Sequence, residues 1–157
     1  MQTFAPSLAA IFHRDLTRLL QEVEGFPDDH SLWQIPEGMN NSPGNLVLHL
    51  EGNLREYIAR QLGAANFQRH RDQEFSTKGL SKADLSHRVN QLILEIPPII
   101  STLLDLEATY PQNVLGAPLS TGHFLLHLLG HFNYHLGQVD CARRAAVSTG
   151  PISFAPL

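Results

Sequence analysis

The stretch STGHFLLHLLGHFNYHLGQVDCARRAAV, residues 120–147, decides what fold and what chemistry to expect of this chain. Its apolar side chains recur every three or four residues, which is the spacing of one face of an α-helix. Ser120 is a residue type that commonly caps a helix N-terminus. We therefore expect an amphipathic helix from Ser120 to about Val147. Its apolar face is formed by Leu125, Leu128, Phe132, Leu136 and Val139.

The same spacing predicts three further helices. The first follows a cap at Ser7 and ends near residues 25–27. The second begins at Pro43, which suits the first helical position, and ends at Leu62 before Gly63. The third follows a capping box at Ser81 and continues to Leu106. Residues between these helices, including 63–80, read as polar loops.

Four amphipathic helices without a strand pattern predict an all-α four-helix bundle. Pro97 and Pro98 lie within the third helix and predict a kink there, because each proline removes a backbone donor. The length of 157 residues suits a single domain over residues 1–157.

Composition excludes several classes of protein. The chain is 43% hydrophobic and 17% charged, with a net charge of −4, which indicates a globular protein and disfavours general binding to nucleic acid or anionic membranes. No signal peptide or membrane-length apolar run is visible, so we expect a cytoplasmic protein. The single cysteine, Cys141, excludes a disulfide framework and a cysteine-rich zinc site, and we expect it to be buried.

Four histidines follow one another at intervals of four in the last helix: His123, His127, His131 and His135. At 100° per residue, His135 lies about 50° and His131 about 90° from the centre of the apolar face. His127 lies about 130° away, and His123 lies nearly opposite. The pair His131 and His135 therefore faces the bundle, and two imidazoles at this spacing can bind one zinc, nickel or ferrous ion.

A metal site needs at least a third ligand from elsewhere in the chain. His49 is the best candidate because it stands in an apolar stretch, where a buried imidazole needs a partner. His13, His87, Glu56 and Asp140 compete with it, and spacing alone does not separate them. The chain has no His-Glu-x-x-His motif, no glycine-rich phosphate loop and no Gly-x-Ser-x-Gly motif, which excludes the corresponding enzyme classes.

Three segments resemble the DinB/YfiT-like superfamily. They are the apolar helix around His49, the stretch GHFNYHLGQ at 130–138, and the loop WQIP at 33–36 ahead of the helix start at 42–43. The resemblance covers nearly the whole chain. It implies a four-helix bundle of the DinB/YfiT-like type.

The resemblance also implies a divalent metal ion held by His49, His131 and His135. Zinc or nickel is the expected metal, with iron or manganese as alternatives. Members of this superfamily include thiol-dependent transferases and isomerases, and others are assigned as metal-dependent hydrolases. The resemblance further implies a homodimer, and nothing in it implies contact with DNA.

The sequence departs from the superfamily at Leu136, where its members often carry arginine. This weakens the expectation of a transferase, and Arg143 and Arg144 lie too far along the helix to replace that arginine. Asn53 and Gln138 are candidates for orienting a ligand or water. Trp33 and Phe75 are expected to fill the core, with the wall of a pocket as the alternative.

The expected function is that of a metal-dependent enzyme. It would activate water or a low-molecular-weight thiol and act on a small-molecule substrate. Any such thiol would come from outside the chain. The alternatives are a non-catalytic metal- or ligand-binding dimeric bundle in stress response, and a bundle whose site has decayed.

Overall fold

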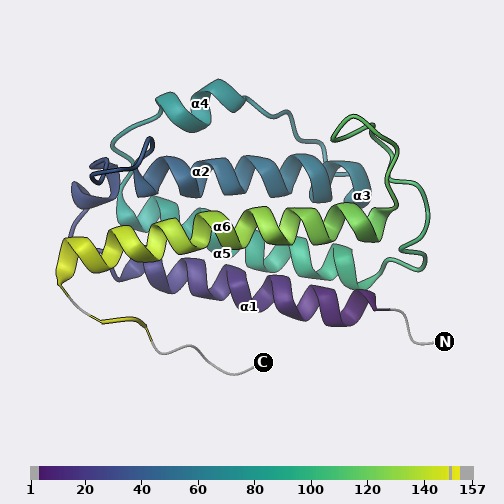
Figure 1. Cartoon of the computed structure of the whole chain (residues 1–157), viewed down its shortest axis with the longest axis horizontal. Coiled ribbons are helices and arrows are strands. Elements are labelled where there is room, and N and C mark those ends of the chain that lie inside the picture. The colour runs from purple at the N-terminus through teal and green to yellow at the C-terminus, as the bar shows by residue number, and fades with distance from the viewer. Residues whose placement is uncertain (1–3, 149, 153–157) are drawn as a thin grey trace.

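The computed structural model describes residues 4–148 and 150–152, and these residues form helices and loops without a β-strand. The all-α prediction is therefore confirmed (Figure 1). Within the described ranges, no helix combines the length and the apolar character needed to cross a membrane. The long helices are α1 (Ala5–Glu24), α2 (Pro43–Leu54), α5 (Lys82–Ser101) and α6 (Thr121–Val147).

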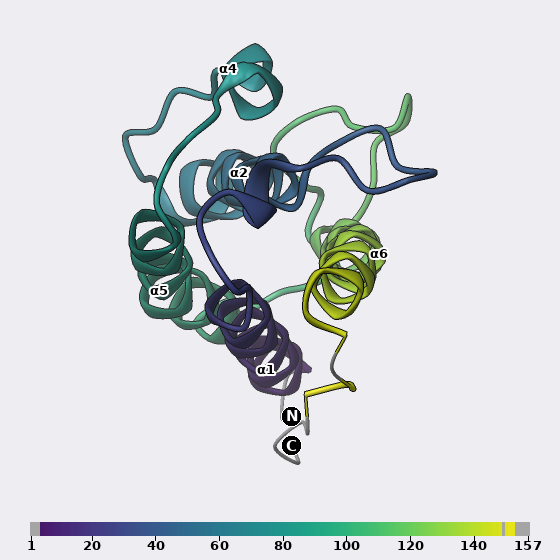
Figure 2. The same ribbon diagram turned by 90° about the vertical axis from the view of Figure 1, so that its left-hand side faces the viewer.

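These helices form a closed ring in which α1 and α2 each contact both α5 and α6 (Figure 2). Their apolar faces meet in one hydrophobic core, as the periodicity predicts. In this ring α2 is the most deeply placed helix, because every residue from Pro43 to Leu54 is buried. A polar side chain on α2 therefore lies inside the molecule.

The α2 helix continues through a π-helical segment, Arg55–Arg60, into the short α3, Gln61–Gly63. The predicted helix over 43–62 is thus confirmed. Gly63 allows close packing, because a Cβ there would lie 2.5 Å from Cδ1 of Ile99 on α5. The left-handed residue that ends the helix is Ala64 (φ 55°).

Two predicted helix ends are wrong. The α1 helix begins at Ala5, not after a cap at Ser7, and Pro6 occupies its first turn. The α5 helix ends at Ser101, five residues before Leu106. The prolines remove backbone donors just before this end, and the Ser101 hydroxyl donates to the Pro98 carbonyl. The Ser81 capping box at the start of α5 is confirmed.

The predicted loop over 63–80 contains a further helix, α4 (Arg71–Ser76), which lies along the outer side of α2 (Figure 1). The buried Asn45 amide on α2 fixes α4, because its Nδ2 donates to the carbonyls of Glu74 and Thr77, each at 2.9 Å. Next to it, Trp33 in the 3-10 helix Ser31–Trp33 packs over Gly44 and donates to the Leu80 carbonyl. Trp33 is partly buried and packs against the hydrophobic core, as expected.

Candidate metal centre

The three predicted metal ligands lie together between α2 and α6. His49, His131 and His135 each offer a ring nitrogen, and these nitrogens all lie within 4.8 Å of one another. Nε2 of His49 and Nε2 of His131 lie 3.2 Å apart. Two nitrogens bound to one tetrahedral zinc ion at ~2.0–2.1 Å would be about 3.4 Å apart. The spacing therefore fits a single ion.

Helix geometry accounts for this convergence. His49 is only 7% exposed because α2 is buried along its whole length. His131 and His135 lie one turn apart on the side of α6 that borders α2, with ring centroids 4.6 Å from each other. The centroids of these two rings lie 5.1 and 5.2 Å from the ring centroid of His49.

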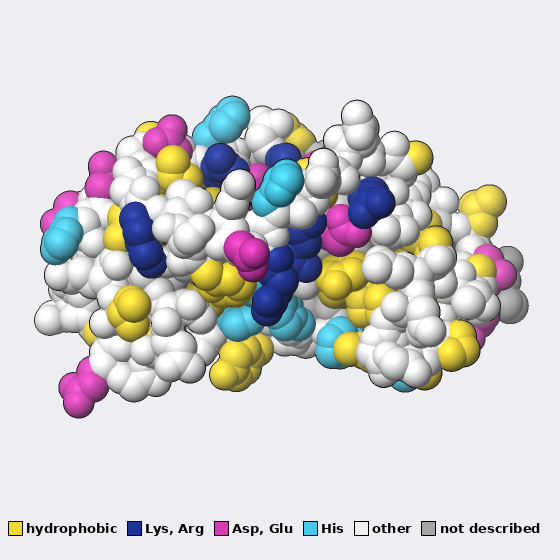
Figure 3. Space-filling model, turned by 90° about the horizontal axis from the view of Figure 1, so that it is seen from above, with side chains coloured by type: hydrophobic (Ala, Val, Ile, Leu, Met, Phe, Trp, Pro, Cys, Tyr) yellow, Lys and Arg dark blue, Asp and Glu magenta, His cyan; other side chains and the backbone are white. Residues whose placement is uncertain are grey.

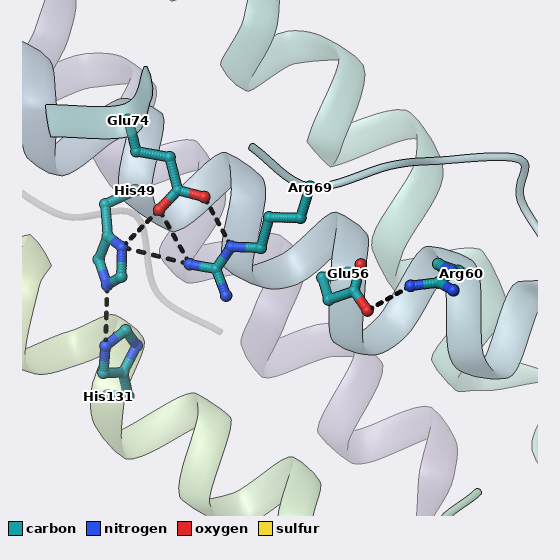
Figure 4. Close-up of polar contacts among 6 residues, drawn as sticks. All are labelled: His49, Glu56, Arg60, Arg69, Glu74 and His131. Carbon is teal, nitrogen blue, oxygen red and sulfur yellow. Dashed lines mark hydrogen bonds and ion pairs between the residues drawn. The ribbon is translucent and has the colours of Figure 1, made fainter. Parts of the chain in front are cut away.

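A carboxylate from α4 holds His49 in place. Nδ1 of His49 donates to Oε2 of Glu74 at 2.9 Å, as Figure 4 shows. Because Nδ1 carries the proton, Nε2 presents its lone pair toward His131. A carboxylate in this position is the usual outer partner of a metal-binding histidine, and it raises the basicity of the ring.

Glu74 is itself held by Arg69. Nε and Nη2 of Arg69 donate to the two carboxylate oxygens of Glu74 at 2.6 and 2.9 Å (Figure 4). Burial alone would raise the pKa of Glu74, but hydrogen bonds from Arg69 and His49 outweigh burial and hold that pKa below its usual value. Glu74 is therefore ionised at neutral pH and is a strong acceptor for His49.

His131 and His135, the two cluster histidines on α6, are neutral at pH 7 because their pKa values are lowered. Burial, with smaller contributions from the neighbouring histidines, lowers the pKa of His131 to about 4. Burial also lowers the pKa of His135, whose Nδ1 donates to Oε1 of Gln138 at 2.7 Å. Gln138 thus orients the ring of His135. Metal binding requires neutral imidazoles, so these rings are prepared for it.

A buried ring nitrogen of His131 also bears on metal binding. Nδ1 of His131 is buried and has no hydrogen bond among the described residues. Burying an imidazole with so few polar contacts is costly unless the ring binds something. A metal ion bound by the same ring would offset this cost.

The competing candidates lie outside this cluster. His13 and His87 are exposed on α1 and α5. Glu56 accepts a hydrogen bond from Arg60 at 2.7 Å, and Asp140 is paired with Arg144 at 2.7 Å. His123 is exposed, as the helical wheel predicts.

The cluster lines one side of a pocket of about 640 Å³, a size suited to a small molecule. Phe75 of α4 lines this pocket with its ring 5.1 Å from His49, so it forms a wall. His127 is exposed at the pocket and stacks on Phe124. Asn53 also lines the pocket, and its Oδ1 is buried without a partner among the described atoms.

The outer side of α6 carries Cys141. Cys141 is exposed, so the prediction that it is buried is wrong. It lies next to the ion pair Asp140–Arg144 on the outer side of the helix. No helix in the described part of the chain packs on this side, so the thiol is not covered. Leu136, by contrast, belongs to the hydrophobic core. Arg143 forms an ion pair with the buried Glu22.

Sequence reasoning missed Glu74 and Gly52, and it gave Arg69 no role. The six residues of α4 are too few to show a helical period, so the loop prediction concealed Glu74. Gly52 matters because a Cβ at this position would lie 2.8 Å from Cδ of Glu74 and closer still to its Oε1. Only the folded structure shows that α4 crosses α2 at this glycine.

Together, the ring of helices and the cluster of three histidines define an all-α bundle with a candidate metal centre between two of its helices. The structure resembles the crystal structure of a DinB-like protein from Bacillus cereus, with a TM-score of 0.69 and 19% sequence identity. The match covers 90% of this chain and 91% of that chain. The chain therefore has the DinB-like fold. The sequence matches no protein-family model, and no curated protein matches it significantly.

Proposed function

We propose that this protein binds one divalent metal ion through His49, His131 and His135 and is a metal-dependent enzyme acting on a small-molecule substrate. The observation that carries the proposal is the convergence of three ring nitrogens, two of them on rings kept neutral by burial. Glu74 and Gln138 fix the rings of His49 and His135. Zinc or nickel suits three imidazoles best, with ferrous iron or manganese as alternatives.

A divalent ion at this site would act as a Lewis acid and lower the pKa of a water or thiol bound to it. Residues of the chain orient the metal-binding rings and shape the space for a substrate. Glu74 keeps the proton of His49 on Nδ1, so that Nε2 faces the cluster. Phe75 covers one side of His49, and the pocket beside the cluster leaves room for a substrate. Cys141 is absent from the pocket lining, so a thiol in the reaction would come from outside.

Metal analysis of untagged protein tests the binding step. We expect close to one equivalent of zinc or nickel after loading, and less than ~0.1 equivalent in His135→Ala. His123→Ala is the matched control, because His123 lies on the same helix and is exposed. Equal metal content in wild type and His135→Ala would refute the site.

Turnover separates an enzyme from a binding protein. The loaded protein would be assayed with simple esters and amides, and with electrophiles in the presence of low-molecular-weight thiols. Activity above the level of His135→Ala supports catalysis. Stoichiometric metal without activity on any of these substrates would instead favour the non-catalytic alternative.

A further inference from the structure

The pocket beside the three histidines has a cationic side that the metal ligands do not use. Arg69 and Arg71 line it, and no Asp or Glu is among the described residues of its lining. Basic side chains and histidines lie side by side on this face of the molecule (Figure 3). A pocket with this charge attracts anions, and a divalent ion bound nearby would strengthen the attraction.

Arg71 differs from the other arginines of the chain. Its guanidinium lies over the ring of Phe75, 5.5 Å from the ring centroid. Every other arginine has a carboxylate oxygen within 4.0 Å, whereas no carboxylate of the described chain lies within that distance of Arg71. Its charge is therefore available to a ligand in the pocket.

Arg69 offers one more donor. Its Nε and Nη2 are engaged by Glu74, and Nη1 makes no hydrogen bond within the described part of the chain. Figure 4 shows this nitrogen on the side of the guanidinium directed away from Glu74. The carboxylate of Glu74 thus fixes Arg69 in an orientation that leaves Nη1 for a ligand.

Asn53 presents a hydrogen-bond acceptor to the pocket, whereas the two arginines present donors. It is 7% exposed, it lines the same pocket, and its Oδ1 is buried without a partner among the described residues. Leaving a buried acceptor unpaired costs about 1–3 kcal/mol, so the position favours a ligand that brings a donor.

We propose that the pocket binds a small molecule carrying a carboxylate and, next to it, an N–H or O–H group. The carboxylate is held by Arg71 and by Nη1 of Arg69, and the donor group is held by Oδ1 of Asn53. Guanidinium and carboxylate form strong charge-assisted hydrogen bonds, which suits this arrangement. The inference rests on the proposed function, because it names the substrate class of the same site.

Isothermal titration calorimetry with two probes tests this inference on the full chain. N-acetylglycine has a carboxylate next to an amide N–H, and N-acetylglycinamide replaces the carboxylate with a neutral amide. We expect N-acetylglycine to bind about tenfold more tightly, a difference of about 1.4 kcal/mol. Arg71→Gln is expected to remove this preference, whereas Arg88→Gln, a partly exposed arginine outside the pocket, retains it.

The titration is repeated after the metal has been removed with a chelator, which separates this inference from the metal proposal. A preference for the carboxylate that depends on Arg71 in the metal-free protein supports the inference, whatever the metal content. Failure of both probes to bind, or equal binding of the two, would overturn it. So would a carboxylate preference that Arg71→Gln leaves intact, or inorganic phosphate binding at least as tightly as N-acetylglycine.

Discussion

Gly52 of α2 lies directly against the carboxylate of Glu74, and this contact allows α4 to reach His49. A Cβ at Gly52 would stand 2.8 Å from Cδ of Glu74. Because Gly52 has no side chain, the carboxylate of Glu74 can pack directly on α2 and accept a hydrogen bond from His49, one turn earlier on that helix. The position of Glu74, and through it the orientation of His49, depends on the absence of a side chain at residue 52.

The first prediction concerns this glycine. Gly52→Ala should displace Glu74 and weaken zinc affinity about 10- to 100-fold, the usual effect of losing an outer partner of a metal ligand. Competition with a zinc chelator measures the affinity. Gly130→Ala is the control, since a Cβ there meets nothing within 4 Å, and alanine should stabilise α6 by about 1 kcal/mol. Unchanged zinc affinity in Gly52→Ala would contradict this role.

The second prediction concerns the charge of Glu74. Glu74→Gln keeps the size of the side chain but loses the ion pair with Arg69 and the strong acceptor for His49. We expect a loss of zinc affinity of about 10-fold or more in the same competition assay. Glu51→Gln removes a carboxylate from α2, the helix that carries His49, and this carboxylate pairs with Arg88 outside the cluster. It should leave the affinity unchanged. A similar loss in both variants would argue against a specific role for Glu74.

The third prediction concerns pH and the metal-free protein. Burial lowers the pKa of His131 to about 4, whereas an unfolded histidine titrates near 6.5. The folded state therefore disfavours the proton. Its stability is full above about pH 6.5 and falls as the pH decreases toward 4. Urea unfolding of chelator-treated protein at pH 7 and pH 5 measures this loss. We expect it to be smaller in His131→Gln than in the control His123→Gln, and equal losses would contradict the prediction.

The fourth prediction concerns thermal stability. A ligand at 1,000 times its dissociation constant stabilises the folded state by about 4 kcal/mol. For a chain of this length, each kcal/mol raises the melting temperature by about 2–4 °C. Zinc should therefore raise the melting temperature by roughly 8–16 °C, and a chelator should reverse the rise. His135→Ala should show no such shift, and a shift as large as that of wild type would place the ion elsewhere.

The sequence predicted the bundle well because its helices are long and amphipathic. The repeated apolar spacing at residues 120–147 marked α6, and Ser81 with Asp84 marked the start of α5. The end of α5 was missed because an apolar seam that continues to Leu106 does not reveal where the backbone loses its hydrogen bonds after Pro98.

The candidate site was likewise predicted only in part from the sequence. The helical wheel selected His131 and His135, and the apolar surroundings favoured His49, so all three rings of the cluster were expected. Glu74 could not be found in this way, because its role depends on the crossing of α4 over Gly52. Apolar periodicity identifies which face of a helix is buried. It does not identify which other segment of the chain packs on that helix. The homodimer implied by the resemblance stays a prediction.

The coordination of zinc in the untagged, loaded protein tests the central claim most directly. Extended X-ray absorption fine structure would report the ligands of the ion in solution. The account predicts three imidazole nitrogens at about 2.0–2.1 Å in wild type, and loss of bound zinc in His135→Ala. A first shell of oxygen alone, or an unchanged spectrum in His135→Ala, would contradict a metal centre at His49, His131 and His135.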